Sequence, residues 1–229
     1  MKTDELIYRK VDSYNDNDMK KLVEMMGLLN KYLKSTVSPL TESQLDWLRI
    51  RMGNVDLLDK IVKNKDNTEY KNQLLKTPDE IAWFCEYNGE VIGYTHVCTY
   101  NIKNGERQND DIGNISDIFV LEKYRKPSIS YGLLTKAFET LIEAGKNRVC
   151  MNVQEDNSNR FLHFALADKI VKRYKCKRTD GSVTVGYELL VSDIKKIQQL
   201  SYRDIAKRAL KVKKEFEQKN LKEPKLFKD

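Results

Sequence analysis

Hydrophobic and polar residues follow a helical spacing through most of the first third of the chain. A short apolar run at residues 6–11 predicts an opening strand that ends in a polar loop. Beyond the loop, apolar residues at helical spacing predict a first helix, which Asn17 or Asp18 is expected to cap. Thr41 and Gln44 carry the sequence signature of a capping box, so a second helix is expected directly after them.

The pattern changes from helical to strand-like near residue 80. A third, short helix is predicted at residues 55–62 after a break at Gly53, and the lysine-rich residues 63–76 are expected to be exposed. Asn88-Gly89 is the typical two-residue turn of a β-hairpin. The apolar runs on either side of it therefore predict two paired strands, at residues 81–87 and 91–100.

Strands and helices alternate in the rest of the chain. A polar loop at residues 103–111 leads into a strand at residues 115–121, and the helix that follows is expected to stop at Gly145. The remaining segments are a strand, a helix and a final hairpin, predicted at residues 148–153, 157–167, 170–177 and 183–191. The order is strand, helices, three strands, helix, strand, helix, two strands, which predicts a mixed α/β fold.

The composition indicates a globular protein with one core. The chain has 229 residues, of which 40% are hydrophobic and 33% are charged. No apolar run reaches the roughly 18 residues that a membrane span needs, and the first residues lack the apolar core of a signal peptide. The four cysteines stand singly and are expected to be reduced thiols of a cytoplasmic protein. With only two histidines and no paired cysteines, no metal centre is expected.

Most of the positive charge lies at the C-terminal end. Residues 191–229 hold 12 Lys or Arg and 6 Asp or Glu, so they carry +6 of the total net charge of +7. We therefore divide the chain into a domain at residues 1–191 and a basic tail at residues 192–229. Within the tail, Ser201 and Asp204 resemble a capping box, and the apolar residues behind them form one stripe of a helix: Ile205, Ala209, Val212 and Phe216.

The sequence does not decide what this basic helix binds. A basic amphipathic helix can dock on its own domain, on a partner protein, on an anionic membrane or on nucleic acid. Its apolar stripe is narrow, which argues against deep membrane insertion, whereas lysine–phosphate contacts with nucleic acid would be weak and sensitive to salt. We expect the tail to dock on another subunit or partner, so the protein is also a candidate homo-oligomer.

Residues 118–134, IFVLEKYRKPSISYGLL, join a strand, a compact basic loop and the start of a helix. Free N–H groups and the positive end of a helix dipole meet at such a junction, which favours anion binding. The stretch resembles the acyl-CoA loop of the GNAT acetyltransferases, which reads roughly V-x(4)-[QR]-x-x-G-x-[GA]. Val120 and Arg125 match this pattern, whereas Ser128 and Ser130 replace its glycines and Pro127 removes one N–H donor.

The resemblance covers residues 5–191 in element order and implies a fold, a donor and a set of contacts. The fold would be a GNAT-type mixed sheet, mainly antiparallel and flanked by helices, with a C-terminal helical extension. The acyl donor would be acetyl-CoA. Backbone groups of Phe119 and Val120 would pair with its pantetheine arm, and Asn157 would bind the same arm. The pyrophosphate would lie against the loop and first helical turn, formed by Arg125, Lys126, Ser128, Ile129 and Ser130.

The catalytic positions are most similar to those of the diamine acetyltransferase branch, which reads E-D-[FL]-[FY]-V before Tyr-Arg. Asp117 matches, and the resemblance implies that its carboxylate meets a cationic substrate. Ser116 stands where the branch has a Glu that relays the proton of the amine. The Tyr acid of the family falls on Phe164, so Glu155 and His163 are the candidate replacements for proton transfer.

Several of these candidates also have a purely structural interpretation. The alternatives are a surface arginine for Arg125, a helix cap for Ser128 or Asn157, a surface carboxylate for Asp117 and a packed helix residue for His163. Two functions therefore stay open. The chain is either an acetyl-CoA-dependent N-acetyltransferase that acts on a primary amine, or a GNAT-derived module that has lost catalysis and serves in a larger assembly. The amine would be a small polyamine-like molecule, a protein lysine or a protein N-terminus.

Overall fold

A computed structural model describes residues 5–34, 38–62, 67–103, 106–108, 111–154, 170–177 and 183–218. Its main helices are α1 (Asp16–Tyr32), α2 (Glu42–Arg51), α3 (Val55–Ile61), α4 (Thr68–Lys76), α5 (Pro127–Glu143), α7 (Val191–Gln198) and α8 (Tyr202–Gln218). Its strands are β1 (Leu6–Lys10), β2 (Glu80–Tyr87), β3 (Glu90–Cys98), β4 (Asn101–Lys103), β5 (Glu106–Gln108), β6 (Ile112–Val120), β7 (Arg148–Gln154), β8 (Ile170–Lys177) and β9 (Val183–Leu190).

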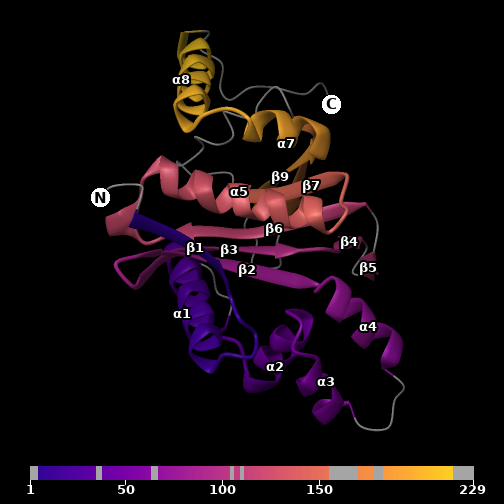
Figure 1. Cartoon of the computed structure of the whole chain (residues 1–229). Helices are drawn as coiled ribbons and strands as arrows, with labels where there is room; N and C mark the ends of the chain where they lie inside the picture. Colours follow the sequence, from indigo (N-terminus) through magenta and orange to yellow (C-terminus); the bar gives the residue numbers. More distant parts are fainter. Residues whose placement is uncertain are drawn as a thin grey trace.

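Seven strands form the main sheet in the order β1-β2-β3-β6-β7-β9-β8, and β4 pairs with β5 separately (Figure 1). Only β6 and β7 pair in parallel within the main sheet, so it is mixed and mainly antiparallel, as predicted. The hairpin at Asn88-Gly89 is confirmed, and both residues have the positive φ angles of a tight hairpin turn, 50° and 77°. The polar loop expected at residues 103–111 instead contributes to the β4–β5 pair.

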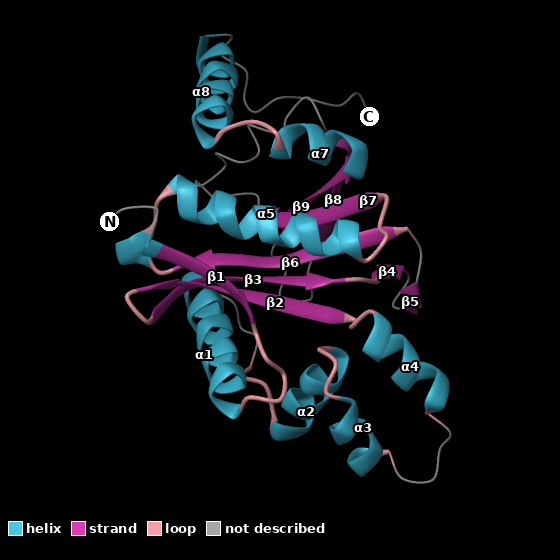
Figure 2. Ribbon diagram, in the orientation of Figure 1, coloured by secondary structure: helices cyan, strands magenta, loops and turns pink. Residues whose placement is uncertain are grey.

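Helices cover both faces of the sheet (Figure 2). On one face, α1 and α2 bury apolar residues such as Met19 and Leu22 against Phe84 and Phe119. On the other face, α5, α7 and α8 share a second core with the sheet, and Ile205 and Ala209 of α8 are buried in it. The first part of the tail therefore packs on its own chain. The predicted dock on a partner is not tested by this contact and stays a prediction.

The first helix begins earlier than the sequence indicated. Its N-cap is Asn15, whose side chain accepts from the N–H groups of Asn17 and Asp18, so the prediction of Asn17 or Asp18 as the cap is wrong. Asp18 is instead turned inward, where it accepts two hydrogen bonds from the Arg9 guanidinium, at 2.6 and 2.8 Å. The ion pair with Arg9 holds β1 against α1.

The region of α2 to α4 agrees with the sequence in part. Thr41 and Gln44 form the predicted capping box at the start of α2. Gly53, which has a φ of 99°, lies just after the end of α2, at the predicted break. Residues 63–76 are not simply exposed, because Thr68–Lys76 form α4 and Leu74 is fully buried against α2 and α3.

Helix α7 was not predicted from the sequence. No helix in the described part of the chain is long and apolar enough to cross a membrane.

Candidate active site

The strands β6 and β7 part in the middle of the sheet. Their parallel pairing runs from Ile112–Arg148 to Ile115–Met151 and goes no further in the described residues. Beyond that point β6 continues to Val120 alongside β3, whereas β7 continues alongside β9. The backbone of β6 from Ser116 onward therefore offers donors and acceptors that β7 does not use.

A β-bulge marks the place where the strands part. The register of β3 and β6 shifts there, because His96 lies opposite Asp117 and Val97 lies opposite Ile115. Ser116 is thus the extra residue of β6. Such a bulge bends its strand and re-aims the side chains beside it. Ser116 is exposed, and Asp117 is half-buried on the face of the sheet that carries α1 and α2.

The loop after β6 leads directly into α5. A single turn at Glu122–Tyr124 is followed by Arg125 and by Lys126, which is the N-cap of α5 with Pro127 in the first helical turn. The N–H groups of Ile129 and Ser130 both bond to the Lys126 carbonyl, at 3.0 and 3.4 Å. The first turn therefore has fewer free donors than a helix that begins with glycines, and Ser128 carries the N–H that is best placed for an anion.

Arg125 is held at the base of this loop. Its Nε donates to the Val120 carbonyl at 3.2 Å, and its guanidinium lies 4.0 Å from the ring centroid of Tyr32, at the end of α1. The two terminal nitrogens of the guanidinium make no hydrogen bond with a described residue, so they are placed to bind an anion. Lys126 is exposed beside it. Phe119, Val120 and Ile129 are buried and form the support under the loop.

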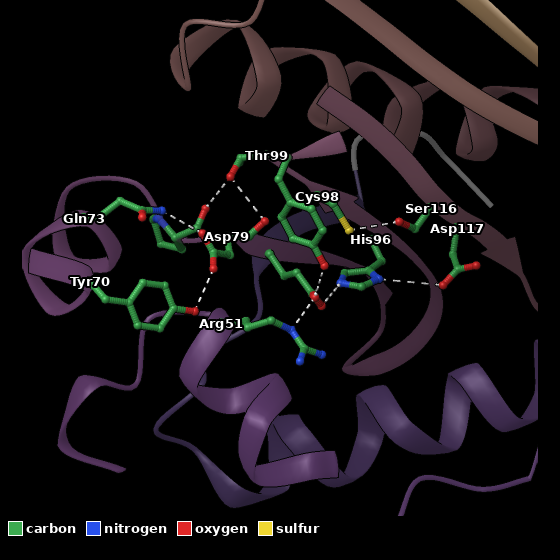
Figure 3. Close-up of polar contacts among 12 residues, drawn as sticks. Arg51, Tyr70, Gln73, Asp79, His96, Cys98, Thr99, Ser116 and Asp117 are labelled. Atoms are coloured by element: carbon green, nitrogen blue, oxygen red, sulfur yellow. Dashed lines mark hydrogen bonds and ion pairs between the residues drawn. The ribbon is translucent and has the colours of Figure 1, made fainter. Parts of the chain in front are cut away.

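A network of charged side chains lies behind Asp117, on the face that carries α1 and α2 (Figure 3). His96 Nε2 is 3.0 Å from Glu80 Oε2, and His96 Nδ1 is 3.8 Å from Asp117 Oδ2. The other oxygen of Glu80, Oε1, accepts from Arg51 Nε at 2.5 Å and from the Tyr100 hydroxyl at 2.9 Å. Glu80 and His96 are buried, so their charges persist only because each is paired.

The pKa values of the network follow from these contacts. Burial opposes charge on the His96 ring, but its contacts with the carboxylates of Asp117 and Glu80 outweigh burial and raise the pKa of His96 well above its ordinary value. Burial likewise opposes charge on Glu80, but the hydrogen bond and charge of His96 and the charge of Arg51 lower the pKa of Glu80 to about 2. The pair is therefore a carboxylate and an imidazolium at neutral pH.

Three further groups lie next to the network. The Cys98 thiol is 3.2 Å from the Ser116 hydroxyl, and burial raises the pKa of Cys98. The Tyr94 hydroxyl is buried without a hydrogen bond to any described residue, and burial and the nearby Asp117 carboxylate raise the pKa of Tyr94. On the neighbouring side, Asp79 accepts hydrogen bonds from α4, which anchors that helix to β2 (Figure 3).

Sequence reasoning placed some of these residues and missed others. Ser116 and Asp117 lie where the strands part, whereas Arg125 and the first turn of α5 lie beyond the end of β6. Three predicted residues, Glu155, Asn157 and His163, lie outside the described residues, as does the predicted helix at residues 157–167. The network of Arg51, Glu80, His96 and Tyr100 was not predicted. Its one sequence signal is a pair of charged residues, Glu80 and His96, in otherwise apolar strand segments.

Comparison with known families gives one match that covers much of the chain. The sequence model described as the Acetyltransferase (GNAT) family matches residues 47–165, which is 119 of the 229 residues. The match begins in α2 and includes β6, the loop and α5. It therefore includes the described part of the candidate site except Tyr32 of α1. No curated protein sequence matches the chain.

Solved structures with a similar fold come from the same class of protein. A chain of the NatC complex bound to Gag peptide and CoA is 13% identical, with a TM-score of 0.53 over 81% of this chain and 98% of its own. An N-acetyltransferase from Staphylococcus aureus Mu50 is 14% identical, with the same TM-score and the same coverage of both chains. YncA from Salmonella typhimurium, solved with its cofactor acetyl-CoA, is 13% identical with a TM-score of 0.53, over 81% of this chain and 94% of its own. At these identities the likeness shows the fold.

Proposed function

The chain belongs to the GNAT acetyltransferase family, and from this membership we propose that it transfers an acetyl group from acetyl-CoA to a primary amine. One structural observation carries the proposal. From Ser116 onward, one edge of β6 has no partner strand among the described residues. This unpaired edge, the half-buried Asp117 and the basic loop before α5 lie within one short stretch of chain, residues 116–130. The site therefore combines a place for an extended donor, a carboxylate for a cation and a positive loop for a phosphate.

The unpaired edge of β6 supports acetyl-CoA as the donor. An extended pantetheine arm has amide groups that can pair with Phe119 and Val120, as an added strand would. The pyrophosphate would then meet the positive end of α5, where Ser128 offers an N–H and the terminal nitrogens of Arg125 have no hydrogen bond to a described residue. Acetyl-CoA supplies a thioester that an amine can attack directly.

Asp117 supports an amine as the acceptor. An amine is a cation at neutral pH and must lose a proton before it can attack a carbonyl carbon. The Asp117 carboxylate is the partly exposed acidic group beside the point where the strands part, with 28% of its side chain accessible. We place the ammonium group against Asp117, and His96 on the other side of the carboxylate holds it in position. The exposed Ser116 hydroxyl lies next to the same point, where a water molecule that carries the proton away would pass.

The acceptor class within amines is a narrower proposal. A carboxylate in a half-buried position suits a flexible primary amine, such as a small polyamine-like molecule, a protein lysine or a protein N-terminus. The basic C-terminal helix lies on the other side of the sheet from Asp117, because Ile205 and Ala209 belong to the core under α5. The tail is therefore not proposed to contact the acceptor amine.

The proposal is tested by acetyl transfer with purified full-length protein. Release of the CoA thiol is followed with spermidine, a lysine peptide and a peptide with a free N-terminus as acceptors, at saturating acetyl-CoA. We expect turnover with at least one of these acceptors. The Asp117→Asn variant should raise the KM for the amine by about 10- to 100-fold, because it loses a charged hydrogen bond to the cation.

A matched variant separates this effect from a general loss of charge. Asp193 is also a half-buried aspartate, but it lies in α7 on the other face of the sheet and pairs with Lys196. Asp193→Asn should leave the KM unchanged. If no amine is acetylated although the protein binds acetyl-CoA, the chain is instead a module that keeps the fold and the donor site without the reaction.

A further inference from the structure

Three side chains that can bind a metal ion meet on one face of the sheet. His96 and Cys98 are two residues apart in β3, so both side chains point to the same face. Glu80 lies directly opposite Cys98 in the β2–β3 register. One Glu80 oxygen, one His96 nitrogen and the Cys98 sulfur all lie within 4.8 Å of one another. The sheet register therefore brings Glu80 next to His96 and Cys98. The sequence prediction of no metal centre rested on the two histidines and the lack of paired cysteines, and neither observation reports on this register.

We propose that Glu80, His96 and Cys98 form a binding site for a divalent transition-metal ion, with Zn²⁺ as the ion that fits best. Thiolate, imidazole and carboxylate together are a ligand set that suits Zn²⁺ and does not suit Mg²⁺ or Ca²⁺, which prefer oxygen. Three protein ligands leave a fourth tetrahedral position for water. The exposed Ser116 hydroxyl lies 3.2 Å from the Cys98 sulfur.

The distances are close to those that a zinc ion requires. Ligand atoms around tetrahedral zinc lie roughly 3.3–3.6 Å apart, given its usual bond lengths. His96 Nε2 and Glu80 Oε2 are already 3.0 Å apart. One ligand atom from each of the three residues lies within 4.8 Å of the other two. A rotation of the Cys98 side chain that moves its sulfur by about 1 Å would bring a separation of 4.8 Å close to this range.

The groups around the three ligands are already arranged as supports for a metal site. Histidine ligands of metals usually place their second nitrogen against a carboxylate, and His96 Nδ1 faces Asp117 at 3.8 Å. Glu80 uses Oε1 for Arg51 and Tyr100, which leaves Oε2 for the ion. Figure 3 shows that His96, Cys98, Ser116 and Asp117 point toward one another. Each ligand thus has a partner that fixes its orientation.

The site is tested with Zn²⁺ and Co²⁺ as probes on the full-length, reduced protein. Zn²⁺ affinity is measured by competition with a chromophoric chelator, and Co²⁺ is used to detect the ligands by its absorption spectrum. We expect one tightly bound ion per chain, a thiolate-to-cobalt band in the near ultraviolet and the visible bands of four-coordinate cobalt. The measurement does not depend on acetyl transfer, so its outcome and that of the proposed function are separate.

Matched variants identify the ligands. Cys98→Ala should lower Zn²⁺ affinity by at least about 100-fold and abolish the thiolate band, and Asp117→Asn should lower the affinity by about 10-fold. Cys85→Ala removes a buried thiol from the adjacent strand β2, outside the cluster, and should change neither. The proposal is overturned if the wild-type protein binds no ion, or if Cys98→Ala binds Zn²⁺ as tightly and shows the same cobalt spectrum.

Discussion

At the scale of the single residue, the structure shows how charged side chains are kept inside the molecule. Asp18 is buried, and it is satisfied by two hydrogen bonds from Arg9 and one from the N–H group of Asp12. Glu80 is also buried and accepts from His96, Arg51 and Tyr100. In both places the carboxylate is shared by partners from different elements. Loss of one partner leaves a buried charge unpaired, which costs more than the pair contributes.

Asp18→Asn should lower the free energy of unfolding by about 2 kcal/mol at neutral pH, because two charged hydrogen bonds are lost in a partly buried place. The hydrogen bond from Arg9 lowers the pKa of Asp18 below its ordinary value. The stabilisation is thus complete above the unfolded-state pKa and is lost as pH falls through the folded-state pKa. The difference between wild type and variant should therefore be complete at neutral pH and should shrink as pH falls below the ordinary aspartate pKa of 3.8 in urea unfolding experiments.

A surface ion pair serves as the comparison for Asp18. Lys21 and Glu24 form an exposed pair on α1, in which the Glu24 side chain is 56% accessible. Glu24→Gln should change stability by less than about 0.5 kcal/mol, since exposed pairs contribute little. An equal effect of the two substitutions would contradict the view that burial makes the Arg9–Asp18 pair important.

At the scale of the element, the contact between β3 and β6 places the donor site. Gly93 lies opposite Val120, and a Cβ at Gly93 would come within 2.8 Å of the Phe119 carbonyl oxygen and 3.3 Å of Val120 Cγ2. The neighbour is backbone, which cannot turn aside as a flexible side chain can. Glycine at this position therefore lets β6 approach β3 closely, and it fixes the two residues that are proposed to pair with acetyl-CoA.

Gly93→Ala should destabilise the protein by about 1–3 kcal/mol, since the two strands must separate to admit the methyl group. The same substitution at Gly27 is the matched control, because Gly27 lies in α1 with no atom within 4 Å of its added Cβ. Gly27→Ala should be neutral or stabilise by up to about 1 kcal/mol through helix propensity. Thermal or urea unfolding measures both, and a stable Gly93→Ala variant would show that the strands are less closely packed than described.

Local patterns predicted elements well, whereas long-range pairing remained hidden in the sequence. The capping box at Thr41 and the turn at Asn88-Gly89 were predicted because their hydrogen bonds join residues close in sequence. Asp18 was misread as a cap because its partner, Arg9, lies in a different element. The meeting of Glu80, His96 and Asp117 depends on strand register and on a bulge at Ser116, which no local pattern specifies.

At the scale of the whole molecule, the basic C-terminal tail is partly built into the core. Ile205 is 1% exposed and Ala209 is 2% exposed, and both belong to the same apolar cluster as Phe138 of α5. The first two residues of the apolar stripe predicted for the tail, Ile205 and Ala209, therefore pack against the core of the same chain. Several lysine and arginine side chains of α8 are exposed, such as Arg203, Lys207 and Lys211. The prediction that the tail docks on another subunit or partner stays a prediction.

Ile205→Ala should lower the free energy of unfolding by about 2–4 kcal/mol, because the smaller alanine side chain leaves a cavity in the core. Leu210→Ala is the control in the same helix, since Leu210 is 55% exposed. It should change stability by no more than about 0.5 kcal/mol. Equal, small effects at both positions in urea unfolding would mean that α8 does not pack on the rest of the molecule in solution.

The most direct test of the central claim, that this chain uses acetyl-CoA, is calorimetric titration of acetyl-CoA into the full-length protein, with desulfo-CoA as a second ligand. The unpaired edge of β6 and the start of α5 predict binding of one molecule per chain with a Kd in the micromolar range, about −8 kcal/mol. Desulfo-CoA should bind as well, since the pyrophosphate and pantetheine contacts do not involve the thioester. Absence of binding by both ligands would contradict the account, and the serine-substituted loop would then no longer hold the donor.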